Sequence, residues 1–156
     1  MTKIKIDSVD RKILSALQDN GRISNISLSE KAGISASPCL RRMRVLLENN
    51  IISKIVAYIN PKFFGYNVSI FVSIQCEELE SKDKQIIEES LSKLVNIQEI
   101  YEIYGDTQYL VKVIARNSYD VVSILEKQIL IIPKISKVKM VSIKSIIKHS
   151  TKIPEL

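Results

Sequence analysis

The order of two hydrophobic periods after residue 66 limits the fold of this chain more than any other feature. Apolar and polar residues alternate over 68–75, apolar residues recur at helical spacing over 82–95, and two further strands are expected over about 97–104 and 108–115. A second helix is expected from Asn117 or Ser118, and a last strand from about 138 to 147. This order predicts a ferredoxin-like βαββαβ domain, an antiparallel sheet with both helices on one face.

Two strands of this expected sheet are apolar on both faces. Leu110 and Ile114 lie opposite a row of apolar residues in the same strand, and Val141 and Ile143 follow Val138 in the last strand. Two helices cover only one side of a sheet, so the second apolar face needs a partner. The simplest partner is a second copy of the chain, which predicts a dimer formed through the sheet.

The residues before this domain follow a helical pattern. Asp7 or Ser8 is expected to cap a first helix that Gly21 ends. A second, very short helix is expected to begin at Ser27, which is spaced from Glu30 as in a capping box. A glycine turn after it leads to a third helix.

The third helix is expected to begin at Ser35 or Ser37 and to turn Leu40, Met43 and Leu47 inward. A short helix, a glycine-containing turn and a longer helix form a helix-turn-helix unit. The stretch 51–66 is extended in pattern and is expected to close this unit as a strand. The sequence therefore predicts an α+β chain, with a helix-turn-helix unit over 1–60, a linker strand to about 66 and the βαββαβ domain over 67–156.

The positive charge of the chain is concentrated in the first unit. The 156 residues carry a net charge of +6, but residues 1–60 hold ten basic and five acidic side chains, a net charge of +5. A basic unit next to a neutral one indicates a polyanionic partner for the first unit. A lysine-decorated surface without a partner is the alternative interpretation.

Several classes of function are disfavoured by composition. Two Cys and one His cannot supply a four-ligand zinc site or a disulfide scaffold, and four scattered Gly leave no phosphate loop. No catalytic triad, metal or cofactor set is expected, so an enzyme is disfavoured. No apolar run approaches the length needed to span a membrane and no leader pattern opens the chain, which predicts a cytoplasmic protein.

The third helix carries the candidate DNA contacts. Because its inner face is expected to be apolar, its three Arg residues are expected on other faces, where they meet phosphate or guanine edges. The small residues at its start allow close approach to the major groove, and Arg22 adds a backbone contact. The predicted DNA-binding residues are Arg22, Ser35, Ala36, Ser37, Pro38, Arg41, Arg42 and Arg44. A solvated basic helix face is the alternative, but the helix-turn-helix order and the charge asymmetry favour double-stranded DNA.

The stretch ILSALQDNGRISNISLSEKAGISASPCLRRMRVLLENNIISKIVAYINP resembles the N-terminal domain of Lrp/AsnC transcription regulators, and SPCLRR resembles their leucine-responsive members. The βαββαβ order extends the resemblance over nearly the whole chain. It implies winged helix-turn-helix DNA binding, dimers formed through the C-terminal sheets, assemblies up to octamers, and amino acids as effectors. Asn50 stands where the family usually has Gly, and Asn tolerates the same left-handed backbone.

The resemblance also implies an effector site. Family members commonly have Gly-Asp-x-Asp-Tyr between the two central strands, where the effector binds between dimers; here Gly105, Asp106 and Gln108 occupy these positions, and the amide replaces a carboxylate. Alignment adds Ser118, Val141, Ser142 and Ile143 as effector-binding residues. Ordinary hairpin chemistry explains the Gly-Asp pair equally well.

Three functions follow from these observations. The leading hypothesis is a sequence-specific transcription regulator modulated by a small amino acid. The alternative is a nucleoid-associated protein that wraps DNA without an effector, which the loss of a carboxylate at Gln108 favours. An amino-acid-binding enzyme domain with an incidental helix-turn-helix is the third.

Overall fold

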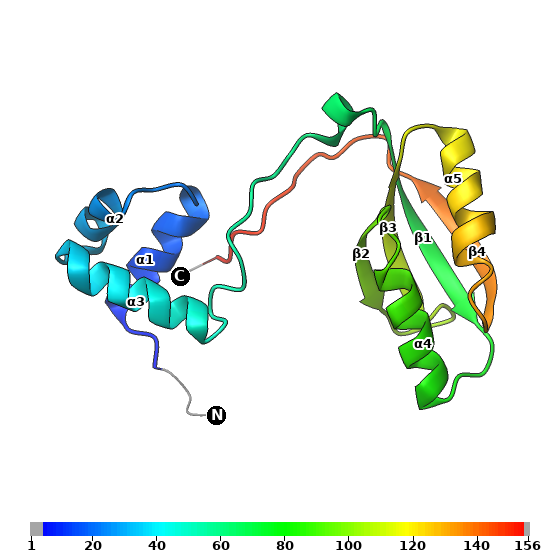
Figure 1. Ribbon diagram of the computed structural model, residues 1–156, viewed down its shortest axis with the longest axis horizontal. Helices are drawn as coiled ribbons and strands as arrows, with labels where there is room; N and C mark the ends of the chain where they lie inside the picture. The colour runs from blue at the N-terminus through cyan, green and yellow to red at the C-terminus, as the bar shows by residue number, and fades with distance from the viewer. Residues whose placement is uncertain (1–4, 155–156) are drawn as a thin grey trace. The chain divides into compact units, whose positions relative to one another are not determined.

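The computed structural model describes residues 5–154, which divide into two compact units (Figure 1). The first unit holds the described residues up to Tyr58 together with those from Lys148 onward, and the second holds 59–147. The C-terminal stretch, which the sequence analysis assigned to the second domain, therefore groups with the first unit.

Three helices form the first unit: α1 (Ser8–Asp19), α2 (Asn25–Ala32) and α3 (Ala36–Glu48). Asp7 caps α1, as predicted, and its carboxylate accepts a hydrogen bond from the Asp10 N–H. The cap of α2 is Ser24, not the predicted Ser27, because the Ser24 hydroxyl accepts the Ser27 N–H and starts the helix three residues earlier. Gly33 ends α2 at a φ of 73°, a left-handed conformation that suits glycine.

The buried face of α3 differs by one residue from the prediction. Cys39 and Leu46 are buried, whereas Leu40 and Leu47 are only half-buried. Met43 packs at the border of the core formed by Cys39, Leu46 and residues of α1 and α2. This rotation changes which face each of the three Arg residues occupies.

The expected strand after α3 is absent from the structure. Asn50 adopts the predicted left-handed conformation at a φ of 56°, but 53–60 form no strand, and Pro61–Phe64 form a 3-10 turn, η1. Val56, Tyr58 and Ile59 remain largely exposed. A strand needs a hydrogen-bonded neighbour, and none pairs with this segment within the described part of the chain.

The second unit has the predicted βαββαβ order. Its elements are β1 (Val68–Cys76), α4 (Ser81–Ser92), β2 (Ile97–Glu102), β3 (Tyr109–Ala115), α5 (Ser118–Ile124), a π-helical turn η2 (Leu125–Ile129) and β4 (Ile135–Ser142). The sheet is antiparallel with the order β2-β3-β1-β4, which confirms the predicted fold class. The last strand begins and ends earlier than predicted, because its pairing with β1 runs from Cys76 back to Ile70.

Both helices of this unit cover the same face of the sheet. Ile87 and Leu91 of α4 and Val121 of α5 share one core with the inward rows of β1 and β3. The opposite face carries an apolar set that we call the open sheet face. It comprises Phe71, Tyr101, Leu110, Ile114 and Val141, none of which is fully buried.

The C-terminal stretch is bound to α1 by side-chain contacts. Lys152 Nζ lies 2.6 Å from the Asp19 carboxylate, which lowers the pKa of Asp19. The Gln18 side-chain amide donates a hydrogen bond to the Thr151 carbonyl and accepts one from the Ile153 N–H. His149 stacks on the Tyr58 ring with their centroids 4.7 Å apart.

Candidate DNA-binding and effector sites

The first turn of α3 presents small side chains to solvent. Ser35 caps the helix with extended backbone, Ser37 and Pro38 are exposed, and Ala36 is half-buried. The Asn25 amide at the start of α2 donates a 2.9 Å hydrogen bond to the Ala36 carbonyl. This bond fixes the beginning of α3 against α2, which leaves the exposed N-terminal turn free to approach another molecule.

Two of the three α3 arginines are free cations. Arg41 and Arg44 are exposed, and neither forms an ion pair with any residue that the structure describes. Arg22 is also exposed, in the turn between α1 and α2, where its N–H donates to the Asn20 side chain. These three guanidinium groups are available to phosphate.

Arg42 has a different environment. One of its guanidinium nitrogens lies 2.7 Å from Asp7 and 2.8 Å from Asp10, both at the start of α1. The Asp10 N–H and the Arg42 guanidinium hold the pKa of Asp7 below its ordinary value, and the two carboxylates raise the pKa of Arg42. Arg42 therefore joins α3 to α1. It differs in this from Arg41 and Arg44, whose side chains are exposed to solvent.

The partners of Arg42 were not identified from the sequence. Asp7 and Asp10 form a reciprocal capping box, in which each side chain accepts the other's backbone N–H. The Asp-x-x-Asp spacing at a helix start was a visible signal for that box. The contact with Arg42 depends on the packing of α3 against α1, which the spacing does not define.

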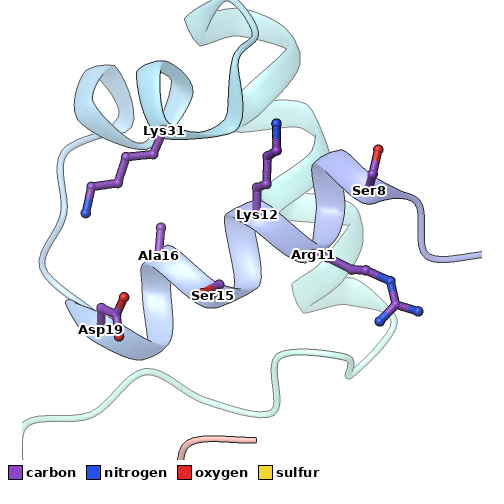
Figure 2. Close-up of a pocket in the computed structure, with 7 residues that line it drawn as sticks. All are labelled: Ser8, Arg11, Lys12, Ser15, Ala16, Asp19 and Lys31. Carbon is purple, nitrogen blue, oxygen red and sulfur yellow. The ribbon is translucent and has the colours of Figure 1, made fainter. Parts of the chain in front are cut away.

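The first unit also contains a groove between α1 and α2. It has a volume of 470 Å³ and is lined by Ser8, Arg11, Lys12, Ser15, Ala16, Asp19 and Lys31. Figure 2 shows the three cationic side chains pointing in different directions around it. The groove therefore extends the basic surface beyond α3, but its cations do not converge on a single ligand position.

The turn between β2 and β3 holds three of the seven predicted effector residues. Gly105 has a φ of 124°, and Asp106 beside it is exposed. The Gln108 amide oxygen accepts the Cys76 N–H at 2.7 Å, next to the register shift between Gln75 and Cys76. Gln108 is therefore engaged in joining the turn to β1, which leaves only its NH₂ group for a ligand.

The remaining predicted effector residues lie at the other end of the sheet. β3 begins at Tyr109 beside the turn, whereas Ser118 follows its far end, and Ser142 pairs with Ile70 of β1. Tyr109 pairs with Ile74, so four residues of β1, about 13 Å, separate the two groups. Val141 and Ile143 lie with Ser142. One chain does not bring the predicted effector residues together.

Two further features concern only the described residues. No group of three His, Cys, Asp or Glu side chains in 5–154 is arranged to hold a metal ion. No helix in the same range is long and apolar enough to cross a membrane.

A helix-turn-helix unit with an exposed basic third helix, joined to an α+β sandwich, defines a DNA-binding regulator with a separate ligand-binding domain. Residues 6–53 match the family of winged helix-turn-helix DNA-binding domains, and 69–153 match the Lrp/AsnC ligand binding domain. The chain belongs to the Lrp/AsnC family of transcription regulators.

Individual relatives span nearly the whole chain. The glutamate uptake regulatory protein of Zymomonas mobilis is 35% identical over 96% of this chain and 91% of its own length. The leucine-responsive regulatory protein of Escherichia coli K12 is 30% identical over 95% of this chain and 90% of its own.

Solved structures of regulators have the same fold. A Neisseria meningitidis transcriptional regulator in complex with L-methionine is 25% identical, with a TM-score of 0.90, and the match covers 96% of this chain and 97% of the other. Escherichia coli AsnC is 26% identical, with a TM-score of 0.85, and the match covers 96% and 99%.

Proposed function

We propose that the exposed face of α3, from its first turn to Arg44, reads DNA in the major groove. Arg41 and Arg44 supply contacts to phosphate or to guanine edges, and Arg22 supplies a contact to the backbone. The small residues Ser35, Ala36, Ser37 and Pro38 allow the helix to approach the bases. The observation that carries this assignment is that Arg41 and Arg44 are exposed on a helix that Asn25 anchors and form no ion pair within 5–154.

Within this proposal Arg42 is a positioning residue. Its guanidinium is held by Asp7 and Asp10, so contact with phosphate would require it to give up two short ion pairs. An inner face of Leu40, Met43 and Leu47 would place Arg42 among the DNA contacts, but the buried residues of α3 are Cys39 and Leu46. We assign Arg42 instead to the orientation of α3 against α1.

The protein is proposed to work as a dimer that assembles further, up to an octamer. The open sheet face, with Phe71 beside Val141 and Tyr101 beside Leu110, exposes apolar surface that a second copy would cover. The unpaired segment 53–60 adds exposed apolar side chains and free backbone groups, which a strand exchanged with another copy would satisfy.

The effector is proposed to be a small amino acid bound between dimers at the Gly105–Asp106 turn. Asp106 is exposed and carries the charge that an α-ammonium group needs. The separation of Ser118, Val141, Ser142 and Ile143 from this turn fits a site completed by another copy. The methionine bound to the Neisseria regulator supports an amino acid as the class of ligand. Such a ligand shifts assembly only by binding one state more tightly.

A nucleoid-associated protein that binds DNA without an effector is the second candidate. The hydrogen bond from Cys76 to Gln108 favours it, because a side chain at the expected ligand position serves the fold. Calorimetry with the common amino acids separates the two candidates, since binding that Asp106→Ala abolishes excludes an effector-independent protein.

An enzymatic role is disfavoured in either case, because the relatives are named as regulators. A DNA target also supports the predicted cytoplasmic location.

The test of DNA reading is a gel-shift titration at moderate salt. We expect the full chain to bind DNA from upstream of its own coding sequence more tightly than a shuffled fragment of equal length, by a factor of about 10³ or more. Equal affinity for both fragments would exclude sequence-specific regulation and leave the second candidate.

A further inference from the structure

The second unit contains a polar pocket away from the Gly105–Asp106 turn. It lies where β3 ends and α5 begins, and it has a volume of 220 Å³. That volume is below the range of about 300–1,000 Å³ that is typical for drug-sized ligands. The pocket therefore suits a small metabolite. Its polar lining residues are Tyr66, Asn96, Arg116, Asp120, Ser123 and Gln128.

Hydrogen bonds of two Asn residues hold two walls of this pocket in place. Two hydrogen bonds of 2.9 Å join Asn96 and Ile114. The Asn96 side-chain amide donates to the Ile114 carbonyl, and the Ile114 N–H donates to the backbone carbonyl of Asn96. The Asn117 side chain accepts the Asp120 N–H at 2.9 Å and caps α5. Arg116 precedes that cap and Asp120 follows it, so the end of β3 and the start of α5 fix both charged residues.

Neither charged group of the pocket has an ion-pair partner among the residues that the structure describes. The Arg116 guanidinium lies over the Tyr66 ring, 5.9 Å from its centroid, which limits its orientations. Neither Arg116 nor Asp120 forms an ion pair through its side chain within the stretch 5–154, and they do not pair with each other. A cation and an anion therefore face one small pocket, and both remain open.

We propose that this pocket binds a free α-amino acid, with the carboxylate on Arg116 and the ammonium on Asp120. Guanidinium recognises a carboxylate with two parallel hydrogen bonds, and a carboxylate accepts from an ammonium group. Ser123, Gln128 and Asn96 supply hydrogen-bonding groups, so the side chain of the ligand is polar, an amide or a hydroxyl. This inference rests on the proposed amino-acid response and adds a second site to the Gly105–Asp106 turn.

The test is calorimetry on the full chain with free asparagine, glutamine, serine, threonine, leucine and methionine. We expect an amide or hydroxyl amino acid to bind. We expect Arg116→Ala and Asp120→Asn each to weaken that binding at least tenfold. Lys127→Ala, which removes an exposed cation of η2 outside the pocket, is the matched control and is expected to leave that binding unchanged.

Blocked ligands assign each charge to its residue. An amino acid whose carboxylate is converted to an amide is expected to bind wild type weakly, and Arg116→Ala is expected to cause no further loss. An N-acetylated amino acid, which lacks the ammonium group, is also expected to bind wild type weakly. Asp120→Asn is expected to cause no further loss of its binding. Circular dichroism on each variant shows that the fold is retained, so that lost binding reports lost contacts.

Three results would overturn this inference. They are the absence of binding by any amino acid in the panel, binding that Asp106→Asn abolishes while Arg116→Ala leaves it intact, and preference for leucine or methionine over every polar amino acid. The second result would leave the effector at the Gly105–Asp106 turn. None of the three affects the DNA-binding proposal, which the gel-shift titration tests separately.

Discussion

Adjacent arginines in α3 have different surroundings. Arg41 is exposed and has no ion-pair partner in the described part of the chain, whereas Arg42 contacts Asp7 and Asp10. Each phosphate contact that is lost changes the slope of log K against log salt by about 0.9. We therefore expect Arg41→Ala to make the slope less steep by about one. Arg42→Ala is expected to leave the slope unchanged and to lower the melting temperature.

The measurement is fluorescence anisotropy with one DNA fragment across a salt series, together with thermal melting of each variant. Lys127→Ala, in the other unit, is the control for a general loss of charge. A slope change in Arg42→Ala equal to that of Arg41→Ala would show that Arg42 meets phosphate after all.

Asp7 makes the stability of the first unit dependent on pH. Its pKa in the folded chain lies below the ordinary value of 3.8, because the Asp10 N–H and Arg42 stabilise the carboxylate. The stabilising contribution is therefore complete above the unfolded pKa and is lost as the pH falls through the lower, folded pKa. We expect the melting temperature of wild type to exceed that of Asp7→Asn at neutral pH.

This difference should shrink once the pH falls below about 3.8 and disappear in stronger acid. Asn is a good helix cap, so the comparison isolates the charge and the ion pair. A difference that stays constant throughout an acid titration would contradict the ion-pair assignment.

Asn50 holds a left-handed conformation, with a φ of 56°, at the end of α3. A left-handed backbone costs a residue with a Cβ roughly 1–2 kcal/mol of conformational free energy. The cost is smaller for Asn and absent for Gly. We expect Asn50→Gly to raise the free energy of unfolding slightly and Asn50→Val to lower it by about 1 kcal/mol. Urea unfolding measures both changes. Equal stability of the Gly and Val variants would show that the turn rearranges.

At the level of elements, the order and pairing of strands followed from the sequence. Clean alternation over 68–75 predicts one central strand, and the largely apolar stretch 108–115 predicts the other. In the structure the inward rows of both strands are buried. The buried face of α3 could not be predicted from the sequence. Leu40–Met43–Leu47 and Cys39–Met43–Leu46 are both helical rows, and only packing against α1 and α2 selects the second.

The candidate effector site was harder to predict for a related reason. Alignment placed Gly105 and Ser142 in one site, but the register of β1 with its neighbours puts them at opposite ends of the sheet. The sequence also gave no sign that the Gln108 side chain turns toward Cys76. Both features depend on contacts between distant residues, which spacing along the chain does not encode.

The open sheet face is expected to carry the contact between copies of the chain. Phe71 and Val141 are cross-strand neighbours on it, and Val141 is 53% exposed. A charge in a buried apolar interface costs far more than one in water. We expect Phe71→Asp to convert the assembly to single chains while the circular dichroism spectrum stays that of a folded protein. Size-exclusion chromatography measures this change.

Lys127→Asp is the control, since it places the same charge in the exposed part of η2. An unchanged elution volume for Phe71→Asp would show that self-association uses another surface, such as the segment 53–60.

In the whole molecule, the chain passes between its two units twice. It leaves the first unit near Tyr58 and returns to it at Lys148, and the returning stretch is bound to α1 through the Lys152–Asp19 ion pair. The ligand-binding unit is therefore joined at both of its ends to the unit that carries α3.

Reading two DNA half-sites requires at least two copies of α3, so self-association is the property on which regulation depends. Sedimentation velocity on the full chain at micromolar concentration tests it most directly. We expect a dimer or a larger assembly whose distribution shifts when a bound amino acid is added. A stable single-chain species under these conditions would contradict the proposal that the open sheet face pairs with a second copy, and with it the regulator that we describe.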